Sequence, residues 1–110
     1  MDAAEAARAY YEHIDAADYE ALHALLAPMF VHDRPDMTLE GREEFVSFMR
    51  KDRPDTDTSH AVDAVYTTAE GDGVVVEGRL LRGDGSEWFS FCDAFDRDGG
   101  KFTRLRTYTR

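Results

Sequence analysis

The segment WFSFCDAFDRDGG, residues 88–100, places a carboxylate among aromatic side chains. In a β-strand, successive side chains point to opposite faces, so Phe89, Phe91, Asp93 and Phe95 would share one face. Burial of an unpaired carboxylate is costly, so its pKa should rise, and a neutral carboxyl can donate a hydrogen bond to a ligand oxygen. The pattern predicts Asp93 as a catalytic residue in an apolar pocket. The alternatives are a bulge that rotates it outward or an arginine partner on a neighbouring strand.

Two further groups of residues have side chains that can move or share a proton. His32 carries a proton near neutral pH, and Asp33 can orient it or replace it. The alternative is that both are solvated loop residues. Tyr10 and Tyr11 point about 100° apart on a helix. One of them can therefore aim its hydroxyl into a pocket; otherwise the pair supplies core rings with hydroxyls at the rim.

The remaining histidines and the single cysteine do not form a metal site or a nucleophilic centre. His60 begins a predicted strand and can line the mouth of a pocket, whereas His13 and His23 are expected on helix surfaces. Neither H-x-H nor H-x-x-x-H spacing occurs, so we expect no metal and no other cofactor. Cys92 is expected to fill space in the core, because no basic group lies near it in the sequence.

Composition restricts the partners. The 110 residues carry a net charge of −10, and Lys51 and Lys101 are the only lysines. Such an acidic chain repels nucleic acid and anionic lipid. Acidic excess with few lysines favours a surface adapted to high salt over an ordinary acidic protein. With one cysteine, no apolar run long enough to cross a bilayer and no signal peptide, we expect a soluble cytoplasmic protein of one domain, residues 1–110.

The elements that would position these residues are helices first and strands second. Helical spacing and capping residues predict a helix after Asp2, a second from Asp18 to Pro28, and a third over residues 42–50, with a short extended piece at 29–32 and a loop at 33–41. A charged connection, residues 51–57, follows. Four alternating runs separated by glycine-rich turns then predict an antiparallel meander. This order indicates an α+β fold, in which the three helices pack in the concave face of a curved, mostly antiparallel sheet and form a cone-shaped half-barrel.

Three stretches together resemble the SnoaL-like branch of the nuclear transport factor 2-like superfamily. They are AARAYYEHIDAADYEALHALLAPMFVHD, LEGREEFVSFM and FCDAFDRDGGKFTRLRTY, and they cover nearly the whole chain. The resemblance implies a cone of curved sheet with three helices. It does not fix an activity, because the superfamily includes isomerases, cyclases, dehydratases, epoxide hydrolases, ligand binders and adaptors.

Comparison with ketosteroid isomerase within this superfamily assigns roles residue by residue. Tyr10 matches the oxyanion-holding tyrosine, and Asp93 matches the protonated aspartate beside it. Asp33 matches the aspartate base if one gap is allowed; without the gap, Arg34 takes that position. Where relatives often place an acid near the C-terminal end of the last strand, this chain has Thr107 and Thr109.

The sequence therefore predicts a binding site for a small apolar or carbonyl-bearing molecule. Its catalytic residues would be Asp93, Tyr10, Asp33 and His32, and its substrate-binding residues Phe89, Phe91, Phe95, Tyr11, His60 and Phe45. The chemistry would be cofactor-free proton transfer in an isomerase, cyclase or dehydratase. The alternative is a non-catalytic ligand binder or dimeric interaction module whose aromatic side chains fill the cavity. The strip RLRTYTR, residues 104–110, favours pairing of its arginines with carboxylates and a homodimer interface.

Overall fold

The computed structural model describes residues 1–53 and 55–110. The helix α1 (Ala3–Asp15) starts at the predicted cap, where the Asp2 side chain accepts a hydrogen bond from the Glu5 backbone N–H at 2.8 Å. Helix α2 (Tyr19–Ala24) is capped by Asp18 in the same way. Helix α3 (Arg42–Ser47) continues into a π-helical turn, η1 (Phe48–Asp52). Pro54, inside the predicted charged connection, lies outside the described residues.

Two strands lie between α2 and α3, where the sequence predicted the end of a helix, a short extended piece and a loop. The second helix ends at Ala24 rather than Pro28, and β1 (Leu26–Asp33) follows at once. Pro28 falls in the irregular part of β1, where the pairing with its neighbour shifts register between Leu26 and Val31. A strand tolerates proline at such a bulge. The predicted loop contains β2 (Thr38–Glu40), which pairs with β1 in an antiparallel hairpin.

The predicted meander is confirmed in the second half of the chain. It consists of β3 (Thr58–Thr67), β4 (Gly73–Arg82), β5 (Glu87–Asp98) and β6 (Lys101–Thr109), each antiparallel to the next. The β1–β2 hairpin extends this sheet because β1 pairs in parallel with β6, which gives the six-strand order β2-β1-β6-β5-β4-β3. The α+β half-barrel is thus confirmed, with one parallel pair in an otherwise antiparallel sheet.

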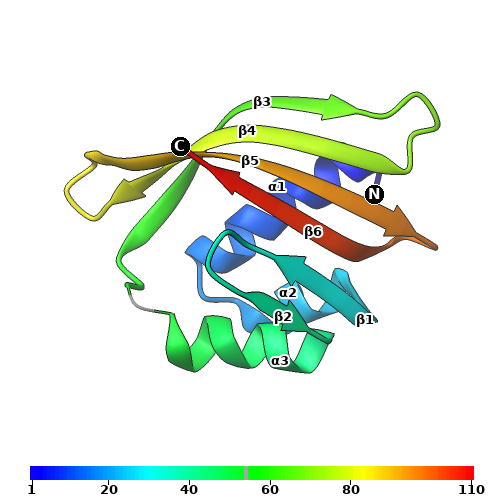
Figure 1. Ribbon diagram of the computed structural model, residues 1–110, viewed down its shortest axis with the longest axis horizontal. Coiled ribbons are helices and arrows are strands. Elements are labelled where there is room, and N and C mark those ends of the chain that lie inside the picture. The colour runs from blue at the N-terminus through cyan, green and yellow to red at the C-terminus, as the bar shows by residue number, and fades with distance from the viewer. Residues whose placement is uncertain (54) are drawn as a thin grey trace.

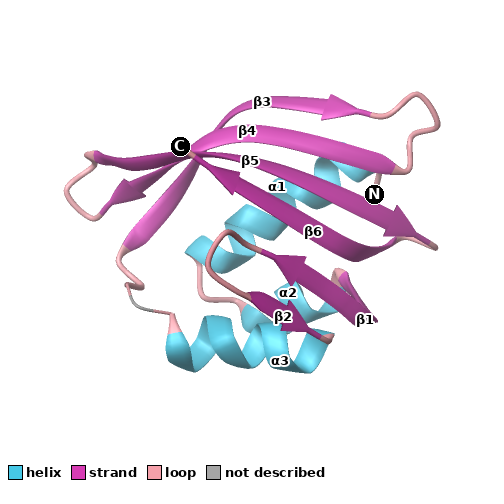
Figure 2. Cartoon of the chain, in the orientation of Figure 1, coloured by secondary structure: helices cyan, strands magenta, loops and turns pink. Residues whose placement is uncertain are grey.

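The sheet bends around α1, and the helices gather on its inner side (Figures 1 and 2). One source of the bend is the pairing of β3 with β4, whose register shifts between Val62 and Ala64. Gly78 lies beside this bulge. A Cβ atom there would come within 2.5 Å of the Ala61 carbonyl oxygen and 2.7 Å of the Phe91 ring. Glycine therefore allows the close approach that the bend requires.

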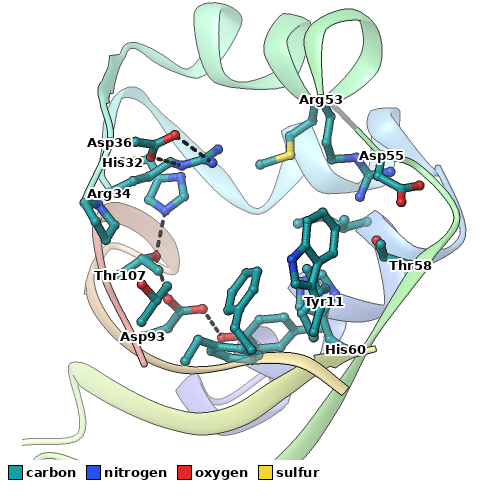
Figure 3. Close-up of a pocket in the computed structure, with 18 of the residues that line it drawn as sticks. Tyr11, His32, Arg34, Asp36, Arg53, Asp55, Thr58, His60, Asp93 and Thr107 are labelled. Atoms are coloured by element: carbon teal, nitrogen blue, oxygen red, sulfur yellow. Dashed lines mark hydrogen bonds and ion pairs between the residues drawn. The ribbon is translucent and has the colours of Figure 1, made fainter. Parts of the chain in front are cut away.

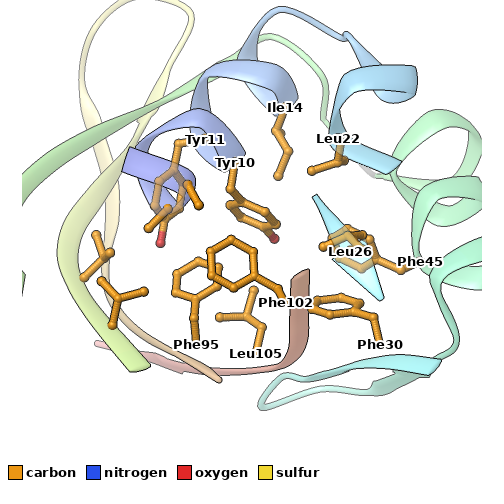
Figure 4. Packing of buried hydrophobic residues seen from close by; sticks show 14 of the residues in the cluster. Tyr10, Tyr11, Ile14, Leu22, Leu26, Phe30, Phe45, Phe95, Phe102 and Leu105 are labelled. Carbon is orange, nitrogen blue, oxygen red and sulfur yellow. The ribbon is translucent and has the colours of Figure 1, made fainter. Parts of the chain in front are cut away.

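The closed part of the cone is filled by a hydrophobic core between the helices and the sheet (Figure 4). Its largest fully buried side chains come from α2, α3 and strands β1, β5 and β6: Leu22, Leu26, Phe30, Phe45, Phe95, Phe102 and Leu105. Phe30 and Phe45 contact each other edge to face at 5.0 Å between ring centroids, and Phe95 lies 4.7 Å from Phe102. The core thus closes one end of the cone and leaves the other end open.

Candidate functional site

A pocket of about 390 Å³ occupies the open end of the cone (Figure 3). This volume lies within the range of small-molecule sites in proteins. Its inner wall is mostly apolar and aromatic and includes Tyr10, Tyr11, Ile14, Met49, Leu80, Trp88, Phe89 and Phe91. Charged residues line it as well, among them Arg34, Asp36, Arg53 and Asp55. Such a cavity suits a molecule with an apolar body and few polar groups.

Asp93 lies on this wall and is 5% exposed, so its carboxyl is buried as the strand pattern predicted. It pairs across the sheet with Thr107 of β6, which brings the two side chains to the same face. The Thr107 hydroxyl donates a hydrogen bond to Asp93 Oδ1 at 2.5 Å, and the Tyr11 hydroxyl donates to Oδ2 at 2.6 Å. Burial raises the pKa of Asp93 above its ordinary value, although both hydrogen bonds and the nearby His60 act in the opposite direction.

The two tyrosines of α1 take different positions. Their rings are perpendicular, with centroids 5.1 Å apart (Figure 4). Tyr11 donates the hydrogen bond to Asp93, whereas the family resemblance matched Tyr10 to the tyrosine that holds a ligand oxygen. Tyr10 lines the pocket and packs against Phe45 and Phe95. Burial raises the pKa of both phenols, with Asp93 adding to the shift, so both stay protonated near neutral pH.

His32, on β1, joins the same wall through Thr107. Its Nε2 lies 2.8 Å from Thr107 Oγ1, while its Nδ1 is buried without a hydrogen-bond partner among the described residues. Burial, with Arg34 adding to the effect, lowers the pKa of His32 to about 3. The imidazole is therefore neutral at ordinary pH. With Tyr11, these residues form one continuous chain: His32, Thr107, Asp93 and Tyr11.

His60, on β3, lines the pocket as predicted and is held from α1. Its Nδ1 lies 2.6 Å from Asp15 Oδ1, and its backbone N–H donates to Asp15 Oδ2 at 2.9 Å. Its ring packs 5.0 Å from the ring of Tyr11 and 5.8 Å from that of Phe91. Asp15 is the last residue of α1, so the end of this helix fixes the orientation of a pocket imidazole.

The other predicted site residues do not line the pocket. Asp33 points to the opposite face of β1, where it forms an ion pair with Arg104 and accepts a hydrogen bond from Thr38, and the Arg104 contact lowers its pKa. Phe45 and Phe95 lie in the core, 0% and 1% exposed. The predicted pairing of strip arginines with carboxylates is observed for Arg104 and also for Arg106, which lies 3.6 Å from Asp96.

The sequence missed several lining residues, such as Met49, Trp88 and Arg53, and two residues that hold the site by hydrogen bonds, Thr107 and Asp15. Thr107 was noted only as the replacement of an acid. Counting back from the Asp98–Lys101 pair would have placed Arg106 opposite Asp93, and a register shift between Asp96 and Arg97 brings Thr107 there instead. Asp15 carried no signal, because its contact with His60 depends on how α1 packs against β3.

The described residues include no group of three or more histidine, cysteine, aspartate or glutamate side chains arranged to hold a metal ion. None of the helices in the described ranges has the length and apolarity that crossing a bilayer requires.

A curved sheet that encloses three helices and a pocket defines the nuclear transport factor 2-like class of α+β proteins. The SnoaL-like domain model matches residues 7–105, so the chain belongs to the SnoaL-like domain family. No curated protein matches the sequence.

Solved structures with the same fold share little sequence with this chain. A protein from Kribbella flavida DSM 17836, provisionally named a ketosteroid isomerase, superposes with a TM-score of 0.85 at 20% identity, over 97% of this chain and 76% of its own. A provisionally named polyketide cyclase from Pseudomonas putida KT2440 gives 0.78 at 24% identity, over 98% and 91%. An NTF2-like protein of unknown function from Cytophaga hutchinsonii ATCC 33406 gives 0.77 at 17% identity, over 92% and 83%.

Proposed function

We propose that this protein binds a small, largely apolar molecule bearing a carbonyl or hydroxyl oxygen and transfers a proton on that molecule without a cofactor. The observation that carries the proposal is the buried Asp93 carboxyl at the pocket wall, held by Tyr11 and Thr107. A carboxyl with a raised pKa in a cleft is characteristic of acid–base sites. The provisional names of two structural neighbours, an isomerase and a cyclase, belong to the same range of chemistry.

A count of hydrogens shows how the wall would hold a ligand oxygen. When Asp93 is ionised, the hydroxyls of Tyr11 and Thr107 both donate to it, and neither has a hydrogen left for a ligand. When Asp93 is neutral, the side chains of Asp93, Tyr11 and Thr107 together carry three hydrogens on oxygen. This is one more than the two hydrogen bonds between them use. Either Asp93 or Tyr11 can then donate to an oxygen in the pocket. Burial, which raises the pKa of Asp93, favours this second state.

The reaction that fits this wall is enolisation of a ketone or a related step in isomerisation, cyclisation or dehydration. A base removes a proton from the carbon beside the carbonyl group, and negative charge develops on the oxygen. Donors from Asp93 and Tyr11 stabilise that charge, and loss of one such donor costs roughly 2.7–4 kcal/mol of transition-state stabilisation. The base would be a histidine of the pocket wall. Asp33, which pairs with Arg104 on the other face of β1, is too far from this wall to fill the role.

The proposal is tested with 2-tetralone, an apolar ketone whose α-hydrogens exchange with deuterium when it enolises. Proton NMR in D2O should show exchange faster in the presence of the protein than in buffer. Asp93→Asn should reduce the protein-dependent rate about 100- to 1,000-fold. Asp96→Asn is the matched control, because this residue lies on the same strand but faces Arg106 outside the pocket. Exchange that is unaffected by Asp93→Asn would contradict the proposal.

Non-catalytic binding is the second candidate function, favoured by the aromatic rings of Trp88 and Phe89 in the pocket wall. Calorimetry with 2-tetralone separates the two functions. Binding without any protein-dependent exchange would assign the pocket to ligand storage or transport rather than to catalysis.

A further inference from the structure

His60 and Asp15 form a second acid–base pair at the pocket, separate from the chain of hydrogen bonds around Asp93. The Asp15 carboxylate contacts His60 at two points. Its Oδ1 lies 2.6 Å from the imidazole Nδ1, and its Oδ2 accepts a hydrogen bond from the His60 backbone N–H at 2.9 Å. Two bonds from one carboxylate fix both the backbone and the ring of His60. The side chains of His60 and Asp15 are 16% and 24% exposed, so both are partly shielded from water.

The contact with Asp15 determines which nitrogen of His60 can act as a base. An ionised carboxylate only accepts hydrogen bonds, so Nδ1 must carry the hydrogen. The neutral imidazole then has its lone pair on Nε2, which makes no hydrogen bond within residues 1–53 and 55–110. Nδ1 is the nitrogen bound to α1, and Nε2 lies across the ring from that contact. A carboxylate behind an imidazole also stabilises the imidazolium that forms when Nε2 takes a proton.

The position of His60 brings this base near the groups that would hold a ligand oxygen. Its ring is 5.0 Å from the ring of Tyr11, whose hydroxyl is bound to Asp93. His60 and Asp93 therefore contact the same tyrosine and line the same cavity (Figure 3). A ligand whose oxygen reaches the Tyr11–Asp93 pair presents its neighbouring carbon within the cavity that His60 also lines.

His32 is the less suitable base of the two pocket histidines. Its Nε2 is occupied by Thr107, and its Nδ1 is buried. Burial also opposes formation of its imidazolium. Among the described residues, no carboxylate contacts the ring directly to offset this effect.

We propose that His60 is the catalytic base of this pocket and that Asp15 is its positioning residue. This inference rests on the proton transfer proposed above. In the step, the Nε2 lone pair takes the proton from the carbon beside the ligand carbonyl, and the electrons of that C–H bond form a C=C bond. The carbonyl π electrons move to the oxygen, which Tyr11 and Asp93 hold. His60 then returns the proton to a carbon of the ligand, so no external reactant is consumed.

The kinetic test compares variants of both residues in the 2-tetralone exchange assay. We expect His60→Gln to lower kcat by about 100- to 10,000-fold with KM changed less than about twofold, because a general base contributes to the chemical step rather than to binding. We expect Asp15→Asn to lower kcat by about 10-fold or more, also without changing KM, and Asp15→Glu to restore part of the rate.

The matched control is the pair His23–Glu43. Its Nε2–Oε2 distance is 2.7 Å, similar to that of His60 and Asp15, but it lies away from this pocket between α2 and α3. The variants His23→Gln and Glu43→Gln should leave kcat and KM unchanged.

A spectroscopic readout tests the role of Asp15 without a substrate. Nitrogen-15 NMR of the imidazoles should show the hydrogen of neutral His60 on Nδ1 in the parent protein and a mixture of tautomers in Asp15→Asn. An unchanged hydrogen on Nδ1 in Asp15→Asn would show that the carboxylate does not set the tautomer of His60.

The outcomes separate this inference from the proposed function. Exchange that survives His60→Gln but not Asp93→Asn overturns the assignment of His60 and leaves the proposed function standing. A hydrogen on Nε2 of neutral His60 in the parent protein also overturns it. Exchange no faster than in buffer contradicts the proposed function itself.

Discussion

His32 and His60 line the same pocket, yet they contact carboxyl groups in different ways. His32 is 5% exposed and reaches the Asp93 carboxyl only through the hydroxyl of Thr107. His60 is less buried and contacts the Asp15 carboxylate directly. Both are histidine–carboxyl arrangements, and they differ by one intervening hydroxyl group and by access to water.

The difference shows that the presence of a histidine and a carboxyl group does not by itself make a contacting pair, because the two groups must also touch directly. A direct ion pair can offset part of the cost of a buried charge, whereas a neutral hydroxyl cannot. The wall around His32 is therefore suited to hydrogen bonding between neutral groups, with the pKa of His32 lowered and that of Asp93 raised. At His60, by contrast, a carboxylate contacts the imidazole directly.

Removal of the Thr107 hydroxyl, which lies between His32 and Asp93, should have the largest effect on stability. Thr107→Val keeps the side-chain shape but leaves His32 Nε2 without its partner and Asp93 with one donor fewer. Loss of partners from buried polar groups should lower the free energy of unfolding by about 2–4 kcal/mol. Urea denaturation at neutral pH measures this loss in the free energy of unfolding. Thr103→Val on the same strand is the control, because its exposed hydroxyl makes only a 3.3 Å contact with a backbone carbonyl. Equal effects of the two substitutions would show that Thr107 does not bridge the buried groups.

Acidification should reveal the neutral state of His32. Its pKa is about 3 in the folded protein and 6.5 in the unfolded chain, so the stability it contributes is complete above pH 6.5 and is lost as the pH falls toward 3. Between about pH 7 and pH 4.5 this residue should account for a loss of about 2–3 kcal/mol in the free energy of unfolding. The raised pKa of Asp93 acts in the opposite direction, since its contribution increases as the pH falls.

The measurement is urea denaturation of the parent protein and of His32→Gln at both pH values. The loss assigned to His32 should be absent from the variant, because glutamine does not titrate. An identical pH dependence in the two proteins would show that His32 is not buried in its neutral form.

The sequence predicted the wall around Asp93 better than it predicted the pair at His60, and the reason is geometric. Strand alternation acts over short stretches of chain, so it placed Phe89, Phe91 and Asp93 correctly on the inner face. The same alternation does not say how deep each ring lies, and Phe95 proved to be a core residue.

Contacts between distant elements were beyond such reasoning. The choice between Tyr10 and Tyr11 depends on the rotation of α1 against the sheet, and the Asp15–His60 pair joins residues 45 positions apart. The hairpin of β1 and β2 was missed because Pro28 and a short polar segment have the composition of a loop. Asp33 and His32 are adjacent and were predicted together, but on a strand they face opposite sides of the sheet.

Substitutions of Tyr10 and Tyr11 test the hydrogen bonds around Asp93, and we expect a smaller effect on stability than from Thr107→Val. Tyr11→Phe removes a donor from the buried Asp93 carboxyl and should cost about 1–2 kcal/mol in the free energy of unfolding. It should also raise the pKa of Asp93 further, which carbon-13 NMR of the carboxyl would show. Tyr10→Phe removes a hydroxyl that makes no hydrogen bond within the described residues, so both quantities should stay close to those of the parent protein. Equal shifts in the two variants would show that Tyr11 is not the partner of Asp93.

The smallest stability effect is expected on the His60 side. Asp15→Asn replaces a charged acceptor with a neutral one of the same shape, so the hydrogen bond to the His60 backbone can remain. Partly exposed ion pairs contribute little, and the loss in the free energy of unfolding should be about 1 kcal/mol or less. Asp63→Asn, which breaks a more exposed pair with Arg79, gives the reference value by urea denaturation. A loss as large as that of Thr107→Val would mean that Asp15 holds the fold together, and its effect on proton transfer could no longer be separated from unfolding. A small loss combined with a large fall in kcat would instead mark the pair as functional, because a contact that contributes little to stability then contributes mainly to the reaction.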